Sequence, residues 1–171
     1  MNPYIKDYLA NKVIEYYAQF PELMRDDIQH TQEVVSYTHL IAVGEGLSTE
    51  EVEMLEIVAW LHDIGCPHAK ELYGNSSPVN QQKVGREVAE ELLSPLAVFT
   101  HEQKQWLADI VGTHHQADKA QELNFQPLFE ADLIVNLLSG YHAPDKAEHL
   151  YNTLMQTATG KKLFRTLIKF P

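Results

Sequence analysis

The sequence predicts an all-α protein, and three observations support this fold class. Apolar residues recur at spacings of three and four along most of the 171 residues, which places them on one face of a helix. No run of alternating apolar and polar residues lies between hairpin turns, as it would in a half-buried sheet. No segment repeats with a fixed period. We therefore expect residues 1–171 to form a single compact multi-helix domain.

Capping residues and breakers delimit the first two helices. Asn2 as N-cap and Pro3 at the first helical position predict a helix that runs to about residue 20, before a proline stops it. A second helix is expected over residues 26–43, because two aspartates at its start suit the positive end of a helix and two glycines follow its end. His30 lies on the apolar face of this second helix.

The middle of the chain contains two more helices and a connecting segment. Ser48 and Glu51 have the spacing of a capping box, so a helix should begin there and end before Gly65 and Pro67. We expect residues 66–77 to form a loop that overhangs the end of this helix. Pro78 then starts the next helix, which closes at a Ser-Pro pair.

The second half of the chain continues the same pattern. Thr100 and Gln103 repeat the capping-box spacing, so a further helix should follow them. The strongly apolar residues 127–139 predict a helix that begins at a proline. Residues 144–171 are expected to form one or two helices divided near Gly160.

Charge and cysteine content exclude several classes of protein. The formal net charge of -11 and the dispersal of the thirteen basic residues argue against a nucleic-acid surface. No apolar stretch approaches the roughly 20 residues that span a bilayer. Cys66 is the single cysteine, so no internal disulfide forms, and the N-terminal residues show no basic region followed by an apolar run. We expect a cytoplasmic protein that does not bind membranes.

Four polar residues interrupt apolar helical stripes at widely separated positions. They are His30, the adjacent pair His62 and Asp63, and Asp132. An unpaired carboxylate inside a core costs several kcal/mol, so such groups are normally neutralised or bound to a cation. A shared divalent ion would satisfy all four, and two imidazoles with two carboxylates can leave coordination positions open for water. The sequence therefore predicts a metal site.

Other interpretations of these residues stay open. His30 or His114 alone is as well explained by a core histidine that hydrogen-bonds a carbonyl, and His62 with Asp63 by a hydrogen-bonded pair at a helix end. Asp63 could also bridge two ions with its two oxygens if His114 or His115 supplies a second site. The residues by themselves permit one metal ion or two.

Taken in order, the motifs form a recognisable pattern. His30 is followed by WLHDIG at 60–65, THH at 113–115 and EAD at 130–132. This order and spacing resemble the HD-domain superfamily of metal-dependent phosphohydrolases over residues 26–140, the motif-bearing part of the chain. The resemblance implies a compact helical HD-domain bundle, with His30, His62, Asp63 and Asp132 as the primary metal ligands.

The resemblance also shows where this chain departs from the family. Members with two metals have further histidines in the middle of the chain, and His114 or His115 can be one of them. At the other expected place stands Gln81, whose neutral amide is a weaker ligand than imidazole. We expect one tight ion and a weak or absent second, unless His68 or a water molecule takes that position.

A second departure concerns the positive charge that meets the substrate. Many relatives resemble HDIGK, but here Cys66 follows Gly65. Lys70, Lys83 or Arg86 would have to bind a substrate phosphate, and the planar fork of Arg86 suits this best. A lone buried cysteine is usually a packing residue, so catalysis by Cys66 carries little weight.

These features favour a metal-dependent phosphohydrolase that acts on a small anionic substrate, a phosphorylated metabolite or nucleotide. Fe, Mn, Mg, Ni and Zn are all candidates for the ion, and Asp63 or a nearby histidine would guide the attacking water. Two alternatives remain: a metal-binding regulatory module without turnover, and a di-iron oxygenase, against which Gln81 counts. The apolar C-terminal helices also suggest a homodimer.

Overall fold

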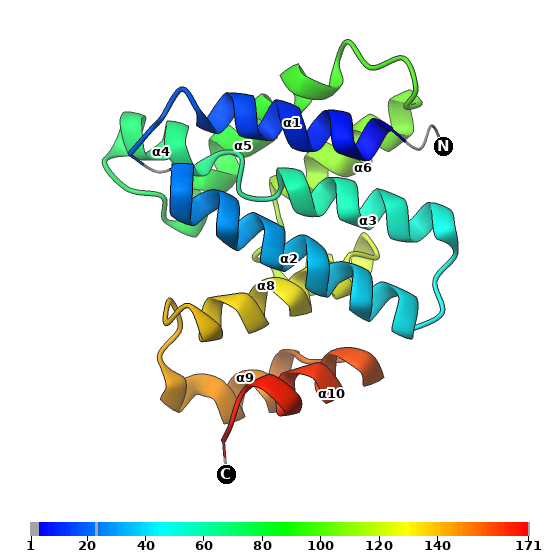
Figure 1. Ribbon diagram of the computed structural model, residues 1–171, viewed down its shortest axis with the longest axis vertical. Helices are drawn as coiled ribbons and strands as arrows, with labels where there is room; N and C mark the ends of the chain where they lie inside the picture. The colour runs from blue at the N-terminus through cyan, green and yellow to red at the C-terminus, as the bar shows by residue number, and fades with distance from the viewer. Residues whose placement is uncertain (1–3, 23, 171) are drawn as a thin grey trace.

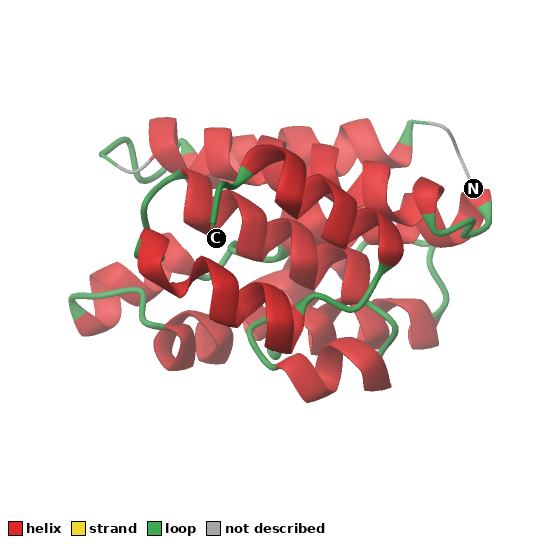
Figure 2. Cartoon of the chain, turned by 90° about the horizontal axis from the view of Figure 1, so that it is seen from below, coloured by secondary structure: helices red, strands yellow, loops and turns green. Residues whose placement is uncertain are grey.

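The computed structural model describes residues 4–22 and 24–170. Over these residues the chain is built from helices joined by short turns, without a strand, and Figure 2 shows this plainly. The predicted all-α fold class is confirmed. The expected N-cap Asn2 and Pro3 lie outside the described residues.

The helices, labelled in Figure 1 where there is room, follow one another with few long connections. Their bounds are α1 Ile5–Tyr17, α2 Met24–Gly44, α3 Thr49–Leu61, α4 Cys66–Tyr73, α5 Pro78–Leu93, α6 His101–Val111, α7 Ala117–Glu122, α8 Gln126–Leu138, the 3-10 helix η1 Pro144–Lys146, α9 Ala147–Leu154 and α10 Ala158–Leu167.

Helices α2, α3 and α8 form the centre of the bundle. Helix α2 packs against both α3 and α8, while α1 covers α3 and α10 covers α8 (Figure 1). Every residue from Pro127 to Leu137 in α8 is buried, as expected for a helix that is surrounded by others. The predicted ligands come from these three central helices or from the turn that follows α3.

Both predicted capping boxes are confirmed. The hydroxyl of Ser48 accepts a hydrogen bond from the backbone N–H of Glu51 at 3.3 Å, and the carboxylate of Glu51 accepts one from the backbone N–H of Ser48 at 2.8 Å. Thr100 and Gln103 exchange the equivalent bonds at 3.2 and 2.9 Å. These reciprocal bonds satisfy otherwise free N–H groups and fix the first turns of α3 and α6.

The expected loop over residues 66–77 is wrong, because its first part is helix α4. Helix α3 ends at Leu61, well before Pro67, and Pro67 lies in the first turn of α4, where a missing N–H costs nothing. Gly74 ends α4 in the left-handed conformation, with φ of 73°. A short helix therefore stands beside the end of α3, where we expected a loop.

The expected division near Gly160 is displaced by a few residues. The break between α9 and α10 falls at residues 155–157, and Gly160 lies inside α10. The buried carboxylate of Glu130 holds this break by accepting hydrogen bonds from the backbone N–H groups of Gln156 at 2.5 Å and Thr157 at 2.8 Å. Glu130 therefore ties the C-terminal helices to α8.

Two further details complete the fold. Helix α2 begins at Met24, two residues before the expected start, and the short helices α7 and η1 were not expected. Among the described residues, no helix is both long and apolar enough to cross a bilayer.

Candidate metal centre

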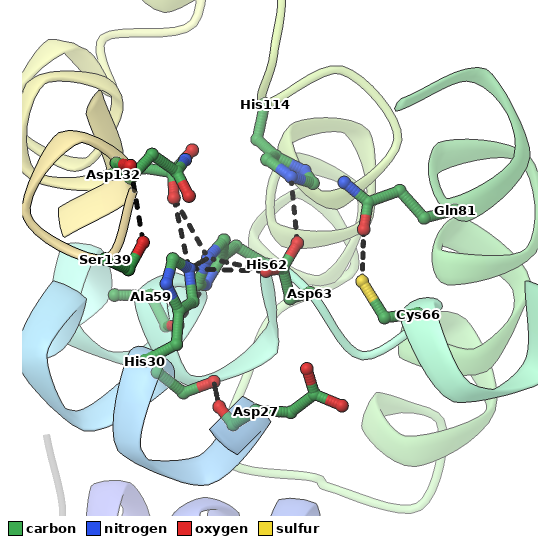
Figure 3. A network of polar contacts seen from close by, with 12 residues as sticks. Asp27, His30, Ala59, His62, Asp63, Cys66, Gln81, His114, Asp132 and Ser139 are labelled. Atoms are coloured by element: carbon green, nitrogen blue, oxygen red, sulfur yellow. Dashed lines mark hydrogen bonds and ion pairs between the residues drawn. The ribbon is translucent and has the colours of Figure 1, made fainter. Parts of the chain in front are cut away.

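The structure brings the four predicted ligands together from separate parts of the chain (Figure 3). His30 comes from α2, His62 and Asp63 from the turn that follows α3, and Asp132 from α8. Nε2 of His30 lies 3.2 Å from Oδ1 of Asp132 and 3.4 Å from Oδ2 of Asp63. Nε2 of His62 lies 3.4 Å from the same Asp63 oxygen.

Backbone contacts orient two of the imidazoles. Nδ1 of His62 donates a hydrogen bond to the carbonyl of Ala59 at 2.7 Å, and Nδ1 of His114 donates one to the carbonyl of Val111 at 3.0 Å. A carbonyl oxygen only accepts, so each Nδ1 carries the proton. In a neutral ring Nε2 is then left with a lone pair, and in both residues it faces a carboxylate.

A second group of candidate ligands adjoins the first. Asp63, His114 and His115 each offer an atom within 4.8 Å of the others, as do His30, His62 and Asp132 in the first group. Nε2 of His114 lies 3.4 Å from Oδ1 of Asp63, whereas Oδ2 of Asp63 faces the first group. Asp63 thus directs one oxygen to each group, the arrangement that a bridging carboxylate requires.

The geometry of both groups fits divalent ions. Ions held by nitrogen and oxygen at about 2.0–2.2 Å place neighbouring ligand atoms about 3.0–3.6 Å apart. The contacts of His30, His62 and His114 with the two aspartates fall at 3.2 to 3.7 Å, too long for strong hydrogen bonds. Oδ1 of Asp63 and Nε2 of His114 are buried and find no hydrogen-bond partner among the described residues. A cation between these atoms would satisfy them.

The electrostatics of the cluster also favour a positive charge at its centre. Burial lowers the pKa of His62, but the charges of Asp63 and Asp132 outweigh burial and raise that pKa to about 9. Burial would raise the pKa of Asp63, yet the positive charge of His62 and a contact with His114 hold it below its usual range. The carboxylates therefore stay ionised and stabilise positive charge at the centre of the cluster.

His115 differs electrostatically from its neighbours. Burial, followed by the charge of His114, lowers the pKa of His115 to about 4, so this imidazole is neutral near pH 7. Its Nε2 accepts a hydrogen bond from the side-chain amide of Gln81, and its Nδ1 lies 3.9 Å from Oδ2 of Asp132. One nitrogen of His115 is thus already engaged by Gln81.

Gln81 lies beside the second group, as the sequence comparison with two-metal relatives led us to expect. Its carbonyl oxygen accepts a hydrogen bond from the Cys66 thiol (Figure 3). Its amide N–H donates a hydrogen bond to His115. Gly65 makes this placement possible, because a Cβ there would lie 2.2 Å from the backbone oxygen of Gln81 and 2.7 Å from Cα of Gly85. Glycine lets the turn after α3 approach the backbone of α5.

A cavity of about 450 Å³ opens over the two groups. His30, Asp63, Gln81 and His115 reach it from the metal side. Its other lining residues were not predicted as site residues, apart from Lys70: they are Asp27, Cys66, Lys70, Ser76, Asn136, Ser139, Gly140 and Tyr141. Helical register would have found two of these, since Asp27 precedes His30 by one turn and Asn136 follows Asp132 by one turn.

The three predicted substrate-binding cations lie in different places. Lys70 lines the cavity, with Nζ 3.9 Å from Oδ2 of Asp27. Arg86 is exposed outside the cavity lining, and its guanidinium bonds Asp109 at 2.6 Å and Glu90 at 3.0 Å. Lys83 is also exposed and stands over the ring of Tyr73, 5.7 Å from its centroid. Of the three, Lys70 has the position that a substrate contact needs.

His68 is the remaining candidate ligand for the second metal position. It lies on α4 and is half-buried, but it belongs to neither ligand group and does not line the cavity. The structure therefore places Gln81, and not His68, next to His115.

A helical bundle that gathers imidazoles and carboxylates under a cavity defines a class of all-α proteins with an internal His/Asp site. The HD domain family matches residues 27–151, and the chain belongs to this family. Its fold is similar to the crystal structure of a predicted HD superfamily hydrolase from an uncultured Thermotogales bacterium, with a TM-score of 0.67 and 24% identity over 96% of this chain and 85% of that one. A comparison with curated proteins finds no match.

Proposed function

We propose that the protein is a metal-dependent phosphohydrolase that acts on a small phosphorylated metabolite. The observation that carries this proposal is the position of Asp63, whose two oxygens face the two histidine groups at the base of an open cavity. The similarity in fold to a protein described as a predicted HD superfamily hydrolase supports hydrolysis as the type of reaction.

In this proposal His30, His62, Asp63 and Asp132 hold the tight ion, and Asp63, His114 and His115 form a weaker second site. The chemistry that a bound divalent ion supplies is polarisation of the phosphoryl group and activation of water. Fe, Mn, Mg, Ni and Zn all accept such mixed nitrogen and oxygen ligands to different degrees. Metal analysis of the purified protein would identify which of these ions is the native one.

The side chains around this site have distinct roles. Lys70 binds an oxygen of the phosphoryl group, because it is a cation that lines the cavity and its charge is only partly offset by Asp27. Asp63 remains ionised and accepts a hydrogen bond from the attacking water, which orients that water toward phosphorus. The hydrogen bonds of His62 and His114 to backbone carbonyls prevent their rings from turning away.

The test is a phosphatase assay with controlled metal content. The chelated protein is reloaded with one ion at a time and given phenyl phosphate and a panel of natural phosphomonoesters, with phosphate release as the readout. We expect turnover with at least one ion and its loss in Asp63→Asn and Asp132→Asn, whereas Asp118→Asn on the exposed side of α7 keeps it. No phosphate release with any ion would contradict the proposal and favour a regulatory module.

One observation favours a second candidate, an iron-dependent oxygenase. The group formed by Asp63, His114 and His115 adjoins the first group closely enough for a two-metal centre. An anaerobically iron-loaded protein that consumes dioxygen with a substrate, and releases no phosphate, would establish this alternative. The cytoplasmic location and the homodimer expected from the sequence stay predictions.

A further inference from the structure

Part of the cavity lining, which we call the polar wall, consists of neutral polar side chains that are not candidate metal ligands. Helix α8 contributes Asn136, one turn beyond Asp132, and the turn after it contributes Ser139. Ser76, between α4 and α5, also lines the cavity. These side chains are neutral hydrogen-bonding groups, so this wall suits an uncharged polar part of a ligand.

Asn136 contributes to this wall a side-chain amide that is available to a ligand. Its side chain is only 8% exposed, yet within the described part of the chain no residue forms a hydrogen bond with its amide. Its backbone carbonyl, by contrast, accepts bonds from the Ser139 hydroxyl at 3.3 Å and the His142 N–H at 2.9 Å. Because Asn136 lines the cavity, its amide is open to water or to a ligand that enters, and a hydroxyl group of a bound ligand could take the place of that water.

Two other buried polar side chains near the site, which are not candidate metal ligands, have partners in the protein. The Gln81 amide contacts both Cys66 and His115, and the Thr31 hydroxyl donates to the backbone carbonyl of Asp27 at 2.8 Å. Asn136 differs from them because it combines burial, a place on the cavity wall and an amide without a protein partner. This combination indicates a contact with the substrate and not a packing role.

The character of the wall limits what the ligand can be. A side-chain amide presents two donors and an acceptor, which match the hydroxyl groups of a sugar or other polyol, and the serine hydroxyls do the same. A flat aromatic base would be expected to stack on an enclosed ring, but the tyrosine in the lining, Tyr141, is 65% exposed at the rim. The cavity volume lies within the usual range for small-molecule sites, about 300–1,000 Å³.

We propose that Asn136 is a specificity-determining residue that binds a hydroxyl group of the substrate, and that the substrate is a phosphomonoester of a sugar or other polyol. This inference rests on the proposed phosphohydrolase function and adds the organic part of the substrate to it. In this inference Lys70 and the metal ligands bind the phosphoryl group of the ester, and Asn136 with the serines of the polar wall binds its hydroxyl groups.

The experiment compares two esters that differ in hydroxyl groups. Kinetics on a hexose phosphate or glycerol phosphate are measured beside phenyl phosphate, which has no hydroxyl, for wild type, Asn136→Ala and Asn136→Leu. Asn152→Ala, an exposed asparagine on α9, is the matched control. Metal content and thermal stability are recorded for every variant, so that unfolding is separated from lost recognition.

We expect wild type to prefer the polyol phosphate over phenyl phosphate in kcat/KM, and both Asn136 variants to lower this preference about tenfold, the value of one good hydrogen bond. Asn152→Ala should keep the wild-type preference. An equal loss on both esters, or a wild-type preference for nucleoside monophosphates that Asn136 does not affect, would overturn the inference while phosphohydrolysis stands. Failure to hydrolyse any ester, phenyl phosphate included, would instead overturn the proposed function and this inference with it.

Discussion

Oδ1 of Asp63 lies 3.4 Å from Nε2 of His114, and neither buried atom has a hydrogen-bond partner among the described residues. Nδ1 of His114 already donates to a carbonyl, so a neutral imidazole presents a lone pair to a carboxylate oxygen. Two such groups repel unless a proton or a metal ion lies between them. This relationship connects the second ligand group to the first and underlies the predictions below.

Replacing Gln81 by histidine should strengthen the second metal site. Gln81 lies next to His115 and is a weaker ligand than imidazole, so the wild-type protein should retain about one tightly bound ion per chain after dialysis. We expect a higher metal-to-protein ratio in Gln81→His, most clearly with Fe, Ni or Zn, measured by plasma mass spectrometry. Gln116→His, at an exposed position, is the control. Two retained ions in the wild type would show that the second site is already strong.

Removing Lys70 should weaken substrate binding without emptying the metal site. Lys70 lines the cavity, whereas Lys83 stands outside it over Tyr73. We expect Lys70→Ala to raise KM on an established phosphoester about tenfold, as the loss of one partly exposed charged contact does. Lys83→Ala should leave KM near the wild-type value, and metal content should be the same in both. A larger effect from Lys83→Ala would mean that substrate enters from the α5 side.

Adding a methyl group at Gly65 should disturb both stability and the second ligand group. The new Cβ would meet backbone atoms of Gln81 and Gly85 within 3 Å, and backbone cannot turn aside as a flexible side chain can. We expect Gly65→Ala to lower the free energy of unfolding by about 1–3 kcal/mol, measured by urea denaturation. Gly112→Ala is the matched control, because its Cβ would find its nearest neighbour at 3.4 Å. Equal stability of the two variants would argue against the close approach of the turn to α5.

Glu130 should contribute to stability and not to metal binding. Its buried carboxylate accepts hydrogen bonds from two backbone N–H groups of the break between α9 and α10. Glu130→Gln keeps the size, and its amide oxygen can still accept from both backbone N–H groups, which bond the same carboxylate oxygen. Its NH₂ group replaces the oxygen that accepts from the Thr157 hydroxyl, and the negative charge is lost, so we expect a loss of about 2 kcal/mol in unfolding free energy. Metal content should match the wild type, and Glu148→Gln on the exposed side of α9 should change neither quantity. Loss of metal in Glu130→Gln would place this residue in the site.

Much of the fold was predictable because its signals are local. Helical periodicity and the capping boxes at Ser48 and Thr100 depend on residues within one turn of each other. Helix α4 was missed because we took Pro67 as the end of the preceding helix, whereas it lies in the first turn of α4. Sequence alone could not distinguish this helix start from a loop.

Part of the candidate site was likewise predictable from the sequence, and part was not. The four primary ligand candidates were recognisable because polar residues interrupt apolar stripes, and burial of such groups is costly. The ion pair of Arg86 with Asp109 was not predictable, since it depends on how α5 packs against α6. Asn136 was missed although it lies one turn beyond Asp132, because we searched the sequence for metal ligands and an amide is a weak one.

The most direct test of the metal site is the metal-to-protein ratio of Asp63→Ala beside wild type. Both proteins are loaded with the ion that supports the highest phosphate release and dialysed against metal-free buffer, with Asp118→Ala as the exposed control. Because Asp63 contributes an oxygen to each ligand group, we expect wild type and control to retain about one ion per chain and Asp63→Ala to retain less than a tenth of that. Undiminished metal in Asp63→Ala, with the variant folded by circular dichroism, would contradict the assignment of these histidines and aspartates as a metal centre.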